Sequence, residues 1–179
     1  MKALTVYHPW AHLIAIGAKR FETRGQKTNH RGPLVIHAGL DTGAAKTLLP
    51  DPDAARPEWP APFRRHLPDD WNKYYALVPG GRLVAVVEVM SCQPADDVAR
   101  MLRRCAKDAA TAKARQRSEE ELAFGDFRAG RWALEMRVLA RLDGTRLVRG
   151  QQGFWNLPPD IEAAVASQLQ GAAGKGGAK

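Results

Sequence analysis

A motif of the form GxKxxExR places Lys19, Glu22 and Arg24 within eight residues of one another. If this segment is extended, Glu22 and Arg24 project from one face, and Phe21 and Thr23 project from the other. Lys19, in the preceding turn, can reach the charged face. The two bases could hold a phosphate, and Glu22 could accept a hydrogen bond from the amino group of a nucleobase. The same charges could instead form an ion-pair cluster that only fixes the turn.

Two aromatic side chains precede the motif. Tyr7 ends a predicted strand beside it. Trp10 shares helical spacing with Leu13 and Ile14, so core packing is its expected role. The alternative for Trp10 is a wall of the cleft that stacks on a base.

The histidines do not make a convincing metal site. His8 and His12 have HxxxH spacing, but zinc would need a third protein ligand, and nothing in the sequence places His37 nearby. There is also no glutamate of the HExxH type. We therefore expect no metal and no cofactor.

Hydrophobic periodicity predicts an α+β fold, with a curved sheet or small barrel. The predicted strands are residues 2–7, 33–38, 82–92, 131–142 and 147–154. The predicted helices are residues 10–17, 42–49, 96–122 and 159–169. The strand at 82–92 is apolar on both faces and should be central.

One domain is expected over residues 1–170, followed by a disordered Gly/Ala-rich tail at 171–179. A Pro-rich insertion at about 50–80 interrupts it, and seven of the twelve prolines lie between Pro50 and Pro79. Aromatic residues predict that this insertion docks on the domain. They are Trp59, Phe63, Trp71, Tyr74 and Tyr75.

The formal net charge is +8, or +6 without Lys175 and Lys179 of the tail, which favours phosphate-bearing partners. Residues 100–117 contain seven basic side chains and one acidic one. This run is either an electrostatic footprint for RNA or a solvated helix face. The sequence lacks a membrane-spanning run and a signal peptide, which predicts a cytoplasmic protein with no membrane partner. Cys92 and Cys105 are expected to be buried free thiols.

Taken with its surroundings, the motif resembles the hallmark of the ASCH family (activating signal cointegrator homology), bacterial or phage type. The resemblance continues through Asn29-His30-Arg31-Gly32-Pro33, residues 124–133 and residues 150–158. It implies a PUA-like small β-barrel with flanking helices and a cleft for RNA or a modified nucleoside or nucleotide. The expected ligand-binding residues are Tyr7, His8, Trp10, Lys19, Glu22, Arg24 and Arg31. Relatives usually carry glutamine and tyrosine where this chain has His8 and His30.

RNA or nucleoside binding is the expected function. One alternative is a hydrolase of the same fold, either a ribonuclease or an N4-acetylcytidine amidohydrolase, with Lys19 and Glu22 as the catalytic candidates. Amidohydrolases of this type use a threonine, a lysine and a glutamate. Their lysine falls on Lys19, but their threonine falls on Glu22 and not on Thr23, and their glutamate has no clear counterpart. A protein-interaction domain without catalysis is the remaining alternative.

Overall fold

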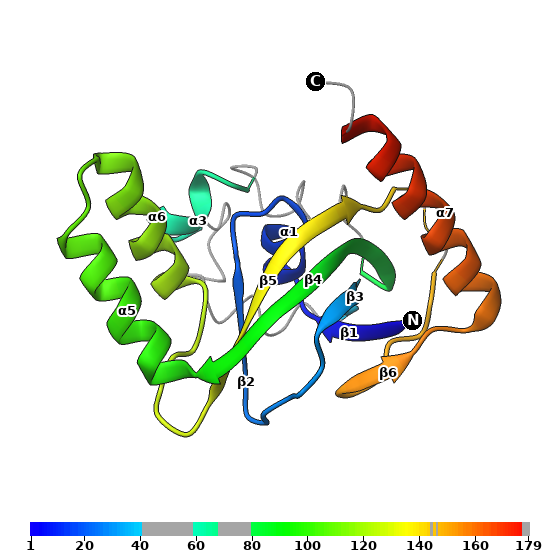
Figure 1. Ribbon diagram of the computed structural model, residues 1–179, viewed down its shortest axis with the longest axis horizontal. Helices are drawn as coiled ribbons and strands as arrows, with labels where there is room; N and C mark the ends of the chain where they lie inside the picture. The colour runs from blue at the N-terminus through cyan, green and yellow to red at the C-terminus, as the bar shows by residue number, and fades with distance from the viewer. Residues whose placement is uncertain (41–58, 68–79, 144, 146, 177–179) are drawn as a thin grey trace, which may run out of the picture.

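The computed structural model describes residues 1–40, 59–67, 80–143, 145 and 147–176. Its centre is a six-stranded sheet in the order β2-β5-β4-β3-β1-β6 (Figure 1). The strands are β1 (Lys2–Val6), β2 (Phe21–Arg24), β3 (Gly32–Ala38), β4 (Arg82–Pro94), β5 (Trp132–Arg141) and β6 (Phe154–Asn156). Neighbouring strands are antiparallel except for β1 and β3, which are parallel.

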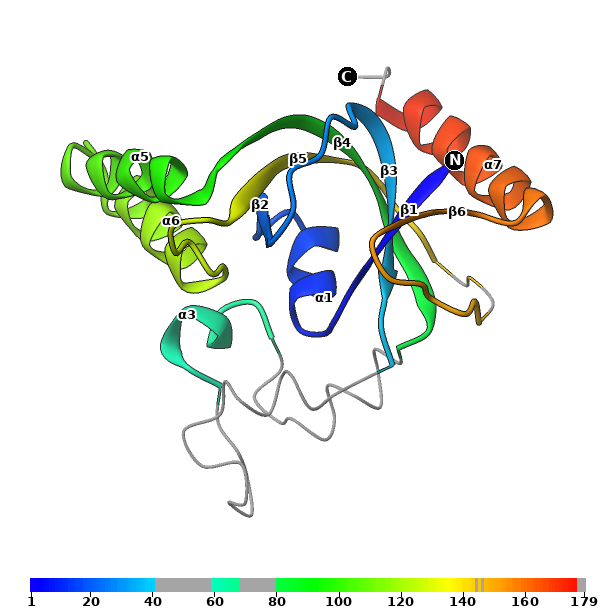
Figure 2. The same ribbon diagram turned by 90° about the horizontal axis from the view of Figure 1, so that it is seen from below.

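The long strand β4 lies inside the sheet between β5 and β3, as its apolar faces predicted. Val87 and Val89 pack into one hydrophobic cluster, whereas Leu83 and Val86 pack into another. The register between β4 and β5 shifts at two places, and such irregularities bend a sheet. The sheet curves around helix α1 (Trp10–Ala15), which lies on its concave side (Figure 2).

The two faces of the sheet bury different helices. On the concave side, Leu4 and Val6 of β1 pack with Ala11 and Ile14 of α1. On the convex side, Ala3 shares a cluster with residues of helix α7 (Pro159–Gly176). The alternation along β1 therefore serves two cores, and the α+β prediction is confirmed.

The predicted helix at 96–122 is in fact two helices, α5 (Ala95–Lys107) and α6 (Ala112–Ala123). They stand together at one end of the molecule (Figures 1 and 2). The side chain of Thr111 caps α6 by accepting a hydrogen bond from Ala114 N, so the chain starts a new helix there. This reversal returns α6 toward β2.

Three other sequence predictions need correction. Residues 147–153 form a loop, because Gly150 packs against the His37 ring and Gly153 has a φ of 70°; only Phe154–Asn156 is a strand. Helix α7 continues through residues 171–176, where the composition predicted an irregular tail. Cys92 is buried as expected, but Cys105 is exposed.

Part of the Pro-rich insertion docks on the domain as predicted. Trp59, Phe63 and Leu67, around the short helix α3 (Ala61–Arg64), are buried against Leu13 and Phe124. Trp71, Tyr74, Tyr75 and the helix predicted at 42–49 lie outside the described residues. Within the described part of the chain, no helix is both long and apolar enough to cross a membrane.

Replacing Phe63 with alanine should lower the free energy of unfolding by about 3 kcal/mol, because Phe63 is a core residue that is only 2% exposed. The centroid of its ring lies 4.9 Å from that of Phe124, in an edge-to-face arrangement. Urea denaturation measures the change. Met101→Ala is the control, since Met101 is exposed and its loss should cost less than about 0.5 kcal/mol. Equal stability of the two variants would show that residues 59–67 do not dock as described.

Candidate functional site

The turn between α1 and β2 positions the motif. Gly17 has a φ of 76°, a conformation that glycine adopts without steric cost. The backbone amides of Ala18 and Lys19 then both donate to Leu13 O, at 2.9 and 3.0 Å. This turn directs Lys19 into the protein and starts β2 two residues later.

Lys19 lies beneath the surface and is only 2% exposed. Its Nζ donates to Phe21 O at 2.5 Å and to Phe124 O at 2.9 Å, and lies 3.6 Å from a carboxylate oxygen of Glu22. The ammonium therefore joins the motif to the segment that follows α6. It is near the cleft, as the sequence indicated, but it does not line any of the three cavities described below.

A second buried charge, Glu121 of α6, supports the same turn from the other side. Its carboxylate is fully buried and accepts hydrogen bonds from the backbone amides of Arg20 and Phe21, at 2.9 and 2.8 Å. Nε of Arg20 lies 3.6 Å from it. No local sequence pattern identifies Glu121, because its partners Arg20 and Phe21 are about a hundred residues away in the chain.

Glu22 and Arg24 share one face of β2, as the alternation predicted. Glu22 is 8% exposed, and one of its oxygens lies 4.0 Å from a guanidinium nitrogen of Arg24, which is one-third exposed. Phe21 faces the opposite way, into a cluster with Val98 of α5. The Thr23 hydroxyl accepts a hydrogen bond from Asp126 N at 2.9 Å.

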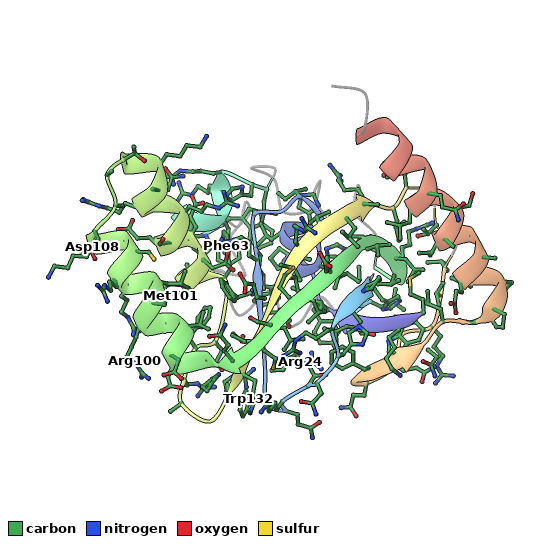
Figure 3. All side chains as sticks on the ribbon, in the orientation of Figure 1. Arg24, Phe63, Arg100, Met101, Asp108 and Trp132 are labelled. Atoms are coloured by element: carbon green, nitrogen blue, oxygen red, sulfur yellow. The ribbon has the colours of Figure 1, made fainter. Side chains whose placement is uncertain are left out.

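Arg24 lines three adjoining cavities. The central cavity, of about 360 Å³, is also lined by Tyr7, Trp10, Glu22 and Asp126. A flanking cavity of about 560 Å³ adds Lys27 and Arg131, and Figure 3 shows Arg24 and Trp132 at this end of the β2–β5 pair. The other flanking cavity, of about 550 Å³, adds His37 and Arg149.

Tyr7 and Trp10 give the central cavity its aromatic walls. Tyr7 is 43% exposed, and its ring lies so close to Gly39 that any side chain there would collide with it. Trp10 is half-buried against the core on the concave side of the sheet while it also lines the cavity. Both predicted roles for Trp10, core packing and cleft wall, are therefore compatible with its place.

The other predicted ligand-binding residues lie apart from the cavities. His8 is buried, and this burial together with His12 lowers its pKa to about 4. Arg31 is exposed and donates to His30 O at 2.8 Å. Neither His8 nor Arg31 lines any of the three cavities. No group of three metal-ligating side chains occurs among the residues that the structure describes.

His37 is buried beside the second flanking cavity. Its Nε2 lies 2.9 Å from Val148 O, and a carbonyl oxygen can only accept a hydrogen bond. Nε2 therefore carries the proton of the neutral ring, and Nδ1 is unprotonated. Burial also lowers its pKa. His37 therefore contributes no positive charge at neutral pH.

The basic run of α5 is partly neutralised by its own acids. Arg100 pairs with Asp96 and Asp97, and Arg104 lies 3.5 Å from Asp108. Figure 3 shows Arg100 and Asp108 on α5, away from Arg24. The run is therefore a weaker cationic surface than its sequence suggested.

A curved mixed sheet around α1, with an acid and an arginine facing a cleft beside Gly17, defines a PUA-like domain of the ASCH type. The chain belongs to the ASCH domain family, whose model matches residues 4–126. The matched region contains the whole motif and all the residues that line the central cavity, and it ends before β5. No match to this chain was found among curated proteins.

Lys19→Met should lower the free energy of unfolding by about 3–5 kcal/mol, because it leaves two buried carbonyls without a donor and Glu22 without its nearest cation. Arg24→Met is the matched control, and it should cost about 1 kcal/mol or less, since the Arg24 pair is long and partly exposed. Chemical denaturation compares the two. A Lys19→Met protein as stable as Arg24→Met would contradict the structural role of the buried ammonium.

Proposed function

We propose that this ASCH domain binds RNA or a modified nucleoside through the central cavity. The supporting observation is the combination of Tyr7 and Trp10 walls with the carboxylate of Glu22 in a cavity of about 360 Å³. Proteins that recognise unstacked bases commonly stack them on aromatic rings and read their edges by hydrogen bonds. Small-ligand sites usually have volumes of this order.

Glu22 suggests which bases would fit. A carboxylate can accept a hydrogen bond from the exocyclic amino group of cytosine, whereas uracil presents a carbonyl oxygen at that position. The carboxylate is held between Lys19 and Arg24, at 3.6 and 4.0 Å, so its orientation is fixed before a ligand arrives. The family is consistent with RNA-related functions, and the choice of base is specific to this proposal.

Binding is favoured over hydrolysis by the state of the candidate catalytic groups. The Lys19 ammonium donates to two backbone carbonyls and lies beside Glu22. In this state it has no lone pair and cannot act as a base toward a substrate. Thr23 lines the central cavity, but its hydroxyl accepts a hydrogen bond from Asp126 N at 2.9 Å. A threonine nucleophile needs an adjacent base that takes its proton, and within the described residues the Thr23 hydroxyl donates no hydrogen bond to a lysine, a histidine or a carboxylate.

A fluorescent pentamer of cytidine should bind with micromolar-range affinity that weakens as salt rises, because phosphate contacts release counterions. A pentamer of uridine should bind more weakly. Glu22→Gln should remove most of this difference, on the order of tenfold, because an amide can donate to the uracil oxygen. Fluorescence anisotropy measures both strands.

The control is Glu119→Gln, which changes the same charge at an exposed site on α6 outside the cavities. It should keep the preference for cytidine. Thermal melting checks that Glu22→Gln remains folded. The proposal fails if neither strand binds at millimolar protein, or if both variants behave like the native chain.

Hydrolysis of N4-acetylcytidine by the native protein should be negligible over hours, since the position of the amidohydrolase threonine is occupied by Glu22. A chromatographic time course, with native and Glu22→Gln proteins, tests this. Rapid conversion to cytidine that disappears in a folded Glu22→Gln variant would make the protein an amidohydrolase with a glutamate-dependent mechanism.

A further inference from the structure

The three cavities around Arg24 differ in charge. Apart from Arg24 itself, the charged side chains that line the central cavity are two carboxylates, Glu22 and Asp126. The flanking cavities contain no carboxylate among the described residues; one contributes Lys27 and Arg131, and the other Arg149. An aromatic cavity lined by carboxylates thus adjoins two cationic ones at Arg24.

The flanking cations differ in how far they are already engaged. Lys27 and Arg149 are exposed, and within the described part of the chain neither pairs with a carboxylate. The Lys27 ammonium lies 5.0 Å from the centre of the Trp132 ring, a contact that leaves its donors accessible. Arg131 instead donates to Thr23 O and Asp126 O, both at 3.2 Å, and its Nε lies 3.3 Å from a carboxylate oxygen of Asp126. Its charge is therefore already paired, and Lys27 is the cation of this cavity that remains available to a phosphate.

The flanking cavities also share a wall. Gln152 and Gly153, in the loop before β6, line both of them but not the central cavity. Arg24 is the residue common to all three. A ligand that fills the central cavity can therefore extend past Arg24 into each of the other two cavities.

We propose that the site holds an internal nucleotide of a single strand, with the base in the central cavity and its two phosphates in the flanking cavities. This inference rests on the proposed function and adds to it the form of the ligand. A free nucleoside carries no phosphate and leaves both cationic cavities unused. The last nucleotide at a strand end supplies only one phosphate, whereas an internal nucleotide supplies one on each side of its sugar.

The test compares cytidine, its 3′-phosphate, its 5′-phosphate and its 3′,5′-bisphosphate by calorimetry at low salt. Each phosphate should tighten binding about tenfold, the scale of one charge-assisted contact. Lys27→Ala should remove the gain from one of the two phosphates, and Arg149→Ala the gain from the other. In each variant the gain is measured relative to that variant's own affinity for cytidine. Lys113→Ala, which removes an exposed charge on α6 outside all three cavities, should change nothing.

The cytidine pentamer provides a second measurement with the same variants. Lys27→Ala and Arg149→Ala should each weaken pentamer binding several-fold and lower the dependence on salt, unlike Lys113→Ala. If cytidine binds as tightly as its bisphosphate, the inference is wrong while the proposed function stands. It is also wrong if the strand binds but neither variant weakens it. If no nucleoside, nucleotide or strand binds, the proposed function itself fails.

Discussion

The contact of the Lys19 ammonium with the carbonyl oxygens of Phe21 and Phe124 is the interaction on which the cleft depends. It fastens the segment after α6 to the start of β2, and that segment supplies Phe124 and Asp126 to the central cavity. An ion removed from water is costly unless strong hydrogen bonds replace its hydration. Glu121 completes the arrangement, because it accepts from the backbone amides just before the carbonyl that Lys19 uses. Two buried charges of opposite sign therefore hold one turn.

Sheet topology explains why Arg24 is central to the site. Arg24 is the last residue of the edge strand β2, and it pairs with Trp132 at the start of β5. Its side chain therefore projects from the end of the sheet toward the surface. Glu22 comes two residues earlier and remains nearly buried. The loop before β6 closes the other side through Gln152 and Gly153. Chain segments far apart in sequence thus meet around one guanidinium group.

Local patterns predicted the parts of this structure that depend on neighbouring residues. Alternation placed Glu22 with Arg24 on one face of β2, and the apolar run at 82–92 predicted that β4 lies inside the sheet. The burial of Lys19 was not predictable, because a lysine in a turn normally reaches solvent. One of the two carbonyl oxygens that accept from its ammonium belongs to Phe124, which is 105 residues away in the chain. The break before α6 did have a local signal, Thr111, since threonine favours helix N-caps.

The motif in this chain thus contains two kinds of residue. Lys19 and Glu22 are nearly buried and fix the turn, and Arg24 is the one of the three that reaches the surface. Under the proposed function, Glu22 of the motif reads the base. Ligand preference would then also depend on residues outside the motif, such as Tyr7, which lines the central cavity, and Lys27 and Arg149, which line the flanking cavities. These positions can change without removing a hydrogen bond from the buried charges, because in the described residues the hydrogen-bond partners of Lys19 and Glu121 are backbone groups of other residues. Domains with the same turn can therefore differ in what they bind, and family membership alone does not determine the ligand.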